Sequence, residues 1–338
     1  LARELAPKRR SDLFRLPVDR IFTMKGYGTV VTGASISGKL AVGDDLIVYP
    51  KGLATKVRNL ESHGADVREA AAGVRTAVNL HGLEVSDLER GDVLARPGTL
   101  FPSLAWDLEL TCLSSAPRSL KHRKQVHFHH GARETMARIY FLDREELKPG
   151  ETAVCQARFE EPLAGVFGDR VVLRSFSPLR TIAGGRLLNP LGRRIKRFSP
   201  QVDKLAVLAQ GQGEDLVRAH LDLAGTGGLT FAMLAVASDL ESKALDKVLA
   251  DLGGRQEAFQ FDREVRTYVG GGVAASLLES LRSFLEAFHR KEPMRPGLSR
   301  GELVSTWRRD LPPKLFHFLL ERAARQGAAV LEGEAFRL

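Results

Sequence analysis

The stretch from Val18 to Gly38 constrains the fold of this chain more than any other part of the sequence. Two runs rich in β-branched residues, Val18–Thr23 and Thr29–Thr32, flank a segment with glycines at positions 26 and 28. β-branched residues favour strands, and glycine permits the positive φ of a tight turn. The period-two alternation, with turn residues every few positions, therefore predicts a small closed antiparallel β-structure.

A nucleotide-binding motif is mimicked within the same stretch. Residues 33–39 match G-x-x-x-x-G-K, the opening of a phosphate-binding P-loop. That motif next needs Ser or Thr to reach Mg²⁺ and a helix N-terminus to face the phosphate, but Leu40 and strand-like residues follow. The sequence also contains no N-K-x-D guanine-recognition motif. We therefore predict that this chain is not itself an enzyme and holds no cofactor.

Composition describes a multidomain globular chain. Its 338 residues exceed one ordinary core, and 43% hydrophobic with 27% charged residues is typical of folded proteins. We find neither a signal peptide nor an apolar run of about 18 residues, so we expect no membrane association. Cys112 and Cys155 provide no disulfide framework and no metal-ligand spacing, which fits a cytoplasmic location.

Positive charge is concentrated in the middle of the chain. Residues 101–200 hold 17 Lys and Arg against 10 Asp and Glu, a balance of +7, out of +9 for the whole chain. Residues 201–338 hold 18 against 19, a balance of −1. A polyanionic partner should therefore bind the middle of the chain and not its C-terminal part.

The hydrophobic period changes from strand-like to helical near residue 199. We predict a multidomain chain with two antiparallel β-barrels followed by two winged-helix α/β domains. The expected segments are a linker at 1–11, barrels at 12–98 and 102–192, and winged helices at 199–269 and 273–338. The expected helices are Asp215–Ala224, Phe231–Ala237, Leu240–Leu252, Val273–Arg290, Ser299–Arg308 and Pro312–Gln326, with wings at Phe259–Val269 and Ala328–Leu338. Gly228-Leu-Thr and Gly297-Leu-Ser recur 69 residues apart, which supports a repeat.

Several motifs carry a family resemblance. The segments that carry it are F-R-L-P-V-D-R-x-F-x-x-K-G-x-G-T-V-V-T-G from Phe14, G-x-R-x-A-V-N-L-x-G from Gly73, R-S-F-S-P-x-x-T-I from Arg174, R-P-G-L-x-R-x-E-L from Arg295 and P-P-x-L-F from Pro312. Together they resemble the bacterial selenocysteine-specific elongation factors, the SelB family. Ala183 replaces the first glycine of the family's T-I-G-G-G segment.

The resemblance implies barrels of the type of elongation factor domains II and III. It also implies a chain that begins mid-protein and lacks both the GTPase domain, with its GTP and Mg²⁺, and the last two winged helices. The intact family member delivers selenocysteinyl-tRNA to the ribosome at recoded UGA codons, and the last two winged helices hold a messenger-RNA hairpin. The two winged helices present here would then be a spacer, in a monomeric cytoplasmic protein.

Two arginines are candidates for the selenocysteinyl group. A selenol ionises below neutral pH, so a pocket that distinguishes it from a seryl hydroxyl needs fixed positive charge, and arginine retains its charge. The family's proposed pocket arginines correspond to Arg20 and Arg75. The alternative is that both are structural, with Arg20 paired to Asp19 or another acid.

A basic segment entering the second barrel is the candidate tRNA-binding region. The predicted contact residues are Arg118, Lys121, His122, Arg123 and Lys124, together with Arg174 and Arg180. Contacts to RNA phosphates set position and not sequence. Two alternatives remain, a solvated charge run and a metal site at His127, His129 and His130, although we find no Cys or acid at ligand spacing. The basic residues 193–197 could also contact RNA or keep a linker soluble.

Two functions of other kinds also remain open. A transcription regulator with an N-terminal β module would carry a basic recognition helix and bind duplex DNA. A degenerate factor that binds no tRNA would be insensitive to the loss of Arg20 and Arg75.

Overall fold

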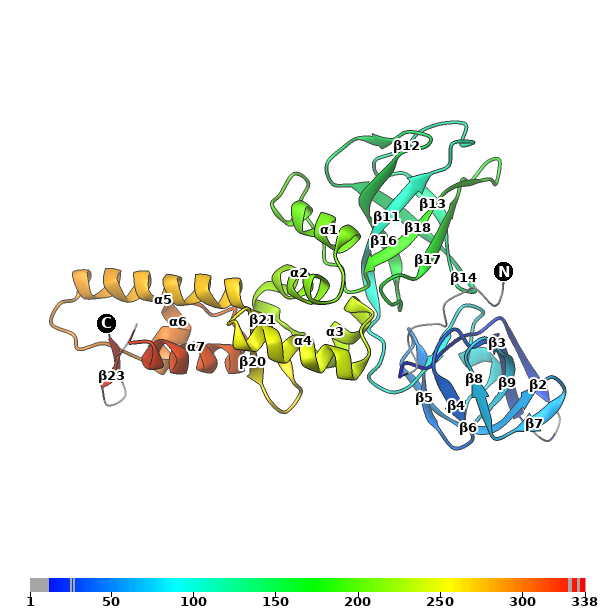
Figure 1. Cartoon of the computed structure of the whole chain (residues 1–338), viewed down its shortest axis with the longest axis horizontal. Coiled ribbons are helices and arrows are strands. Elements are labelled where there is room, and N and C mark those ends of the chain that lie inside the picture. Colours follow the sequence, from blue (N-terminus) through cyan, green and yellow to red (C-terminus); the bar gives the residue numbers. More distant parts are fainter. Residues whose placement is uncertain (1–11, 25, 27, 328–329, 333–334, 338) are drawn as a thin grey trace. The chain divides into compact units, whose positions relative to one another are not determined.

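The computed structural model describes residues 12–24, 26, 28–327, 330–332 and 335–337 (Figure 1). The predicted linker at 1–11 lies outside the described residues. Two compact units make up the described chain: residues up to Leu216 with Ala232–Asp246, and Val217–Phe231 with Lys247–Leu338. The division therefore passes through the first helical repeat and not between the two repeats.

The first sheet is antiparallel and contains eight strands in the order β1-β10-β5-β6-β9-β3-β2, with β7 paired to β6. Its strands are β1 (Arg15–Pro17), β2 (Arg20–Met24), β3 (Gly28–Ala34), β5 (Asp45–Tyr49), β6 (Leu53–Ser62), β7 (Ala65–Val67), β9 (Arg75–Leu80) and β10 (Val93–Ala95), with a separate ladder of β4 (Lys39–Ala41) and β8 (Glu69–Ala71) and a 3₁₀ turn at Val85–Asp87. Val31, Val48 and Val78 belong to the core that the sheet encloses. Among the described residues its ladder runs from β1 at one edge to β2 at the other, so the expectation of a closed structure is corrected to an open barrel.

Gly33 has a packing role. It lies in β3, where an added Cβ would be 2.2 Å from the carbonyl oxygen of Pro17. Glycine therefore allows β1 to approach β3 and the sheet to curl. Leu40 is a buried residue of β4, and strands follow Gly33 where a P-loop would need a helix.

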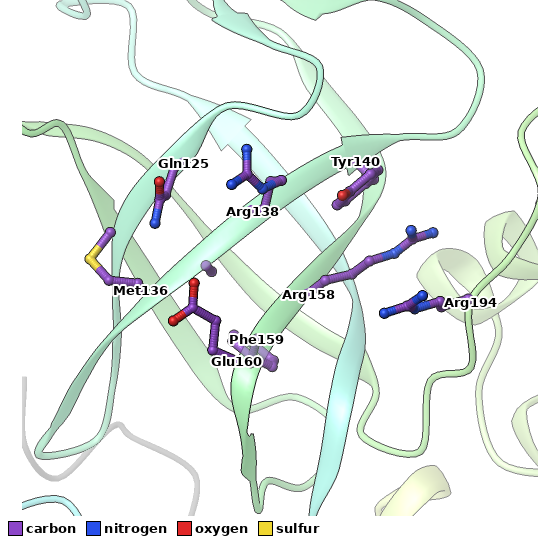
Figure 2. Close-up of a pocket in the computed structure, with 9 residues that line it drawn as sticks. Gln125, Met136, Arg138, Tyr140, Arg158, Phe159, Glu160 and Arg194 are labelled. Atoms are coloured by element: carbon purple, nitrogen blue, oxygen red, sulfur yellow. The ribbon is translucent and has the colours of Figure 1, made fainter.

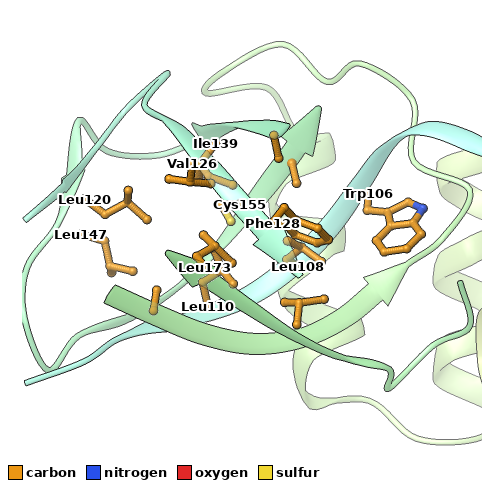
Figure 3. Packing of buried hydrophobic residues seen from close by; sticks show 14 of the residues in the cluster. Trp106, Leu108, Leu110, Leu120, Val126, Phe128, Ile139, Leu147, Cys155 and Leu173 are labelled. Atoms are coloured by element: carbon orange, nitrogen blue, oxygen red, sulfur yellow. The ribbon is translucent and has the colours of Figure 1, made fainter. Parts of the chain in front are cut away.

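The second sheet closes on itself in the order β11-β16-β14-β13-β17-β18. Its strands are β11 (Ser103–Cys112), β13 (Gln125–His130), β14 (Arg133–Phe141), β16 (Thr152–Leu163), β17 (Arg170–Arg174) and β18 (Thr181–Asn189), with β12 (Leu120–Lys121) and β15 (Glu146–Leu147) forming a short extra ladder. Trp106, Phe128 and Cys155 are among the buried side chains that fill the barrel (Figure 3). Burial raises the pKa of the Cys155 thiol well above its ordinary value, as expected of an inert core cysteine.

Charged side chains join the two sheets. Arg15 of β1 donates from Nη1 to Oδ2 of Asp169 over 2.6 Å, and His130 Nε2 lies 3.0 Å from the same oxygen. Arg133 of β14 contacts Glu89, which precedes β10, at 3.2 Å. Because these pairs connect residues far apart in sequence, they hold one sheet against the other.

Helices follow the second barrel. They are α1 (Gln201–Gln210), α2 (Glu214–Ala224), α3 (Phe231–Ser238), α4 (Ser242–Gly254), α5 (Gly271–Lys291), α6 (Arg300–Thr306) and α7 (Pro313–Arg325), with a 3₁₀ turn at Gly225–Gly227. Three-stranded sheets follow the orders β19-β21-β20 and β22-β24-β23, from β19 (Leu229–Thr230), β20 (Ala258–Asp262), β21 (Thr267–Gly270), β22 (Leu298–Ser299), β23 (Val330–Glu332) and β24 (Ala335–Arg337). α1 was not predicted. The helix expected from Leu240 begins at Ser242, and the one expected at Ser299–Arg308 covers Arg300–Thr306.

The repeated Gly-Leu-polar triplets have the same structure. In each triplet the last two residues form a short strand, β19 or β22, and a helix follows at once. A Cβ on Gly228 would lie 2.5 Å from the carbonyl oxygen of Tyr268, and one on Gly297 would lie 2.4 Å from that of Phe336. Both glycines thus let a short strand approach its wing, which supports a tandem repeat.

The R-P-G-L-x-R-x-E-L motif forms a helix cap. Ser299 and Glu302 make a reciprocal capping box at the start of α6, and Arg295 donates to Glu302 over 2.6 Å. The backbone and side chain of Ser299, together with Arg295, lower the pKa of Glu302 to about 2. Helix capping therefore explains Ser299 and Glu302 of this motif without any contact to RNA.

Candidate nucleic-acid interface

An open hollow of about 400 Å³ lies at the edge of the first sheet, lined by Asp19, Arg20, Arg75 and Arg90. Arg20 begins β2 and Arg75 begins β9, and both strands pair with β3. The structure thus brings the two arginines predicted for the selenocysteinyl group to one site. Three guanidinium groups and one carboxylate give the hollow a formal charge of +2.

Asp19 holds Arg75 and not Arg20. Both Nη atoms of Arg75 reach the carboxylate, with Nη2 at 2.9 Å from Oδ1, and Thr32 Oγ1 donates to the same oxygen over 2.7 Å. The alternative that paired Arg20 with Asp19 does not describe this site, because the β2–β3 register places Thr32 opposite Arg20 and Arg75 holds the carboxylate. Among the described residues Arg20 makes no ion pair, and its side chain is exposed.

The electrostatics of Asp19 keep it charged. Partial burial opposes ionisation, but the hydrogen bonds from Arg75 and Thr32 and the charges of Arg75 and Arg20 outweigh it and lower the pKa of Asp19. Arg75 is therefore oriented by an ionised partner at neutral pH. The sequence did not indicate Arg90 as a member of this site, because only the tertiary fold brings the turn before β10 to the start of β9.

The predicted tRNA contacts gather at one end of the second barrel. β13 pairs antiparallel with β17, with His127 opposite Arg174, so residues before Gln125 and after Arg174 leave the barrel together. The loop after β11 joins them, because Leu113 donates its backbone N–H to the carbonyl oxygen of Ile182. We call the predicted set the basic end: Arg118, Lys121, His122, Arg123, Lys124, Arg174 and Arg180.

Residues of the basic end differ in exposure. Arg118, Lys121, Arg123, Lys124 and Arg180 are exposed, whereas His122 and Arg174 are half-buried. The His122 ring meets the Tyr140 ring edge-on, with centroids 5.5 Å apart. Burial and then the charge of Arg197 lower the pKa of His122, so its ring is neutral at pH 7 and contributes shape more than charge.

The loop after β17 combines arginines with exposed apolar side chains. Phe176 is 48% exposed, and its ring packs against His127 with centroids 4.7 Å apart. Leu179 is also 48% exposed and precedes Arg180. An aromatic ring between cations can stack on a base or ribose. The composition of this loop therefore favours RNA binding over the alternative that its charged residues are only solvated.

The histidine segment requires a correction. Val126 and Phe128 are fully buried in the barrel, and His127 and His129 lie on its outer side, as alternation predicts. An acid does lie beside them, because the β13–β14 hairpin places Glu134 Oε1 2.9 Å from His127 Nδ1. Within the described ranges, however, no group of three His, Cys, Asp or Glu side chains could hold a metal ion.

Comparisons with known proteins agree with this architecture. Residues 28–95 match the family described as elongation factor Tu domain 2, residues 107–194 the selenocysteine-specific elongation factor β-barrel domain, and residues 282–338 the elongation factor SelB winged helix. A selenocysteine-specific elongation factor of Desulfomicrobium baculatum is 57% identical over 338 residues, which is 100% of this chain and 53% of that protein. Its Escherichia coli counterpart is 31% identical over 294 residues, 86% of this chain and 44% of that protein.

A solved structure shows the same fold. The crystal structure of a bacterial selenocysteine-specific elongation factor matches with a TM-score of 0.77 at 22% identity, over 100% of this chain and 51% of that one. The fold and the matched domains define part of a translation elongation factor. The first sheet of this chain corresponds to domain 2 of elongation factor Tu. More narrowly, the chain belongs to the SelB family of selenocysteine-specific elongation factors and spans about half the length of the curated relatives it matches. None of the described helices is long and apolar enough to cross a membrane.

Proposed function

We propose that this chain is the tRNA-binding part of a selenocysteine-specific elongation factor. The first sheet recognises the selenocysteinyl group and the second barrel holds the tRNA backbone. GTP hydrolysis with Mg²⁺ and capture of the messenger-RNA hairpin belong to other domains of the intact factor. The ribosome is the remaining partner of this cytoplasmic monomer. Because the chain belongs to the SelB family, we set aside the alternative that it is a transcription regulator.

The hollow of Asp19, Arg20, Arg75 and Arg90 carries this proposal. A selenolate brings one negative charge, and the hollow has a formal charge of +2 with Arg75 already oriented by Asp19. Because Arg20 has no carboxylate partner among the described residues, it is available to the ligand. A neutral seryl hydroxyl gains none of this attraction and leaves the net positive charge of the hollow uncompensated.

The experiment compares binding of selenocysteinyl-tRNA and seryl-tRNA to this chain and to Arg20→Ala and Arg75→Ala. Each variant should lose most of the preference for selenocysteinyl-tRNA and keep the affinity for seryl-tRNA. Asp19→Asn should lose part of the preference, because Arg75 is released. Lys39→Ala, which removes a cation paired with Glu69 outside the hollow, is the control. Unchanged preference in both arginine variants would refute the hollow as the recognition site, whereas a degenerate factor would bind neither tRNA.

The basic end supplies the tRNA contacts in this proposal. Reversing the charges of Lys121, Arg123 and Lys124 should abolish the steeply salt-dependent binding of tRNA. The recoding hairpin should not bind this chain, because the two winged helices act as a spacer. Tight hairpin binding would contradict the spacer role.

A further inference from the structure

A second cationic hollow lies on the outer wall of the second barrel. It has a volume of about 190 Å³ and lies between β13, β14, β16 and the segment after β18 (Figure 2). The polar and charged side chains that line it are Gln125, Arg138, Tyr140, Arg158, Glu160 and Arg194. A space this small fits a single anionic group and not an organic ligand of drug size.

The strand register places like charges directly opposite each other. Gln125 pairs with Arg138, and Arg138 pairs with Arg158, so the three residues form a row across three strands. Like charges facing one another across a ladder destabilise a sheet. An arrangement that costs stability calls for a functional reason, and an anion bound between the two guanidinium groups supplies one.

Among the described residues these arginines lack ion-pair partners, although the charge of the buried Asp107 attracts that of Arg158. Within the described residues Arg138, Arg158 and Arg194 make no ion pair, whereas Arg144, Arg186 and Arg197 of the same region each do. Glu160 is the one carboxylate in the lining, which leaves a formal charge of +2. Burial lowers the pKa of Arg158 and the charge of Arg194 adds to that effect, so the two guanidinium groups repel each other.

Arg158 is held in place for such a ligand. Its guanidinium lies 3.9 Å from the centre of the Tyr140 ring, its Nε donates to Gln156 over 2.8 Å, and Nη2 reaches the carbonyl oxygen of Ile195 at 3.4 Å. In Figure 2 the side chains of Arg158 and Arg194 lie next to each other on one side of the hollow. The fork of a guanidinium matches the oxygens of a phosphate with two parallel hydrogen bonds.

The hollow continues the basic end along the barrel. Gln125 follows Lys124 directly, and Arg138 Nη1 lies 3.5 Å from the carbonyl oxygen of Arg123. A polyanion that follows Lys121–Lys124 therefore reaches the hollow without leaving a positive surface. This continuity favours the backbone of an RNA over an isolated anion.

We propose that Arg138, Arg158 and Arg194 form a phosphate-binding site occupied by a backbone phosphate of the bound tRNA. The site rests on the proposed function, since it needs RNA on the second barrel. Its occupation neutralises the repulsion between Arg158 and Arg194 and so fixes the segment after β18 against the barrel wall.

The test measures binding of a selenocysteine tRNA transcript to the full chain over a salt series. Arg138→Gln and Arg194→Gln should each weaken binding about 3- to 10-fold and lower the salt slope by about 0.7 to 0.9, the loss of one phosphate contact. Arg144→Gln removes the same charge from an exposed ion pair with Asp143 and should leave both quantities unchanged. Arg158→Gln is a second variant with a larger expected loss, because Arg158 also holds Ile195.

A second arm titrates the chain with inorganic phosphate and follows the Nε–H signals of the arginines by NMR. A response of Arg158 that Arg194→Gln abolishes, together with weakened tRNA binding, supports the site. A phosphate response with unchanged tRNA affinity in Arg138→Gln and Arg194→Gln would overturn RNA as the occupant in favour of a free phosphate. If neither arm responds while reversal of Lys121, Arg123 and Lys124 still abolishes tRNA binding, the site is refuted and the proposed function stands. If tRNA does not bind the unaltered chain at low salt, both fall.

Discussion

Two aspartates of the second barrel that are largely shielded from solvent have opposite pKa shifts. Asp107 is fully buried, and burial raises its pKa to about 6 despite hydrogen bonds from Gln156 and Asn189 and the charge of Arg158, which is not bonded to it. The Asp169 side chain is 12% exposed, and its pKa is lowered because Arg15 and His130 outweigh the cost of burial. Amide donors cannot replace a cation when a carboxylate leaves water.

The difference follows from what each aspartate joins. Asp107 organises one barrel, since Gln156 donates to its Oδ1 and Asn189 to its Oδ2, and Gln156 also holds the carbonyl oxygen of Arg193. Asp169 joins two sheets, and its partner Arg15 comes from β1. A charge pair is thus used between sheets and a carboxylate held by amide donors within one, and four variants can test that distinction.

The largest effect is expected from Asp169→Asn. Removing this carboxylate leaves Arg15, whose side chain is 10% exposed, without its counter-charge. Breaking a buried pair from one side costs about 3 kcal/mol or more, and the midpoint of urea unfolding followed by tryptophan fluorescence would fall accordingly. Asp143→Asn, which breaks an exposed pair with Arg144, is the matched control and should cost less than about 1 kcal/mol. Equal losses in the two variants would remove the distinction.

The pH dependence of stability should separate the two aspartates. Because the folded-state pKa of Asp107 is about 6, above its ordinary 3.8, the folded state binds more protons between these values and stability falls as pH rises from about 4 to about 6. The total is about 3 kcal/mol, from about 1.4 kcal/mol for each pH unit. Asp169 has the opposite sign, because its contribution is present above pH 4 and is lost as pH falls further.

Urea unfolding at several pH values is the measurement. Asp107→Asn should remove the decline between pH 4 and pH 6, and Asp169→Asn should flatten the acid limb below pH 4. A decline that persists in Asp107→Asn would assign it to another group.

A smaller loss is expected from Arg133→Gln. Arg133 Nη1 and Nη2 lie 3.2 Å from Glu89 and from Glu161, whose carboxylates are 59% and 71% exposed. Nη1 also lies 3.5 Å from the buried Asp92. Solvent screens the first two pairs, and Lys51 stays 3.3 Å from Asp92, so we expect a loss of about 1 kcal/mol in urea unfolding. A loss as large as that of Asp169→Asn would show that Lys51 does not replace Arg133 as the counter-charge of Asp92.

The smallest effect should have the opposite sign. Arg138→Gln removes one of two arginines that face each other across β14 and β16, so the barrel should become more stable by about 0.2 to 1 kcal/mol. The same variant is expected to weaken tRNA binding. Destabilisation would mean that the aliphatic part of Arg138 matters more than its charge.

Much of this architecture could be predicted from local patterns. Three features can be recognised from short stretches of sequence alone. They are the period of two over Val18–Thr32, the change to helical periodicity, and the repeat of Gly228 and Gly297. Such patterns reflect backbone preferences and which face of an element is buried. They also identified Arg20, Arg75 and the basic end as candidates, through a family resemblance and charge density.

Tertiary structure alone decided which charges meet. The pairing of Asp19 with Arg75, the approach of Arg90, the Glu134 beside His127 and the row from Gln125 to Arg158 all depend on strand register. Register brings together residues far apart in sequence, and shifting it by one residue turns every side chain to the other face. Composition determined that this protein is basic in its middle third, and the ladders determined where that charge is paired and where, among the described residues, it makes no ion pair.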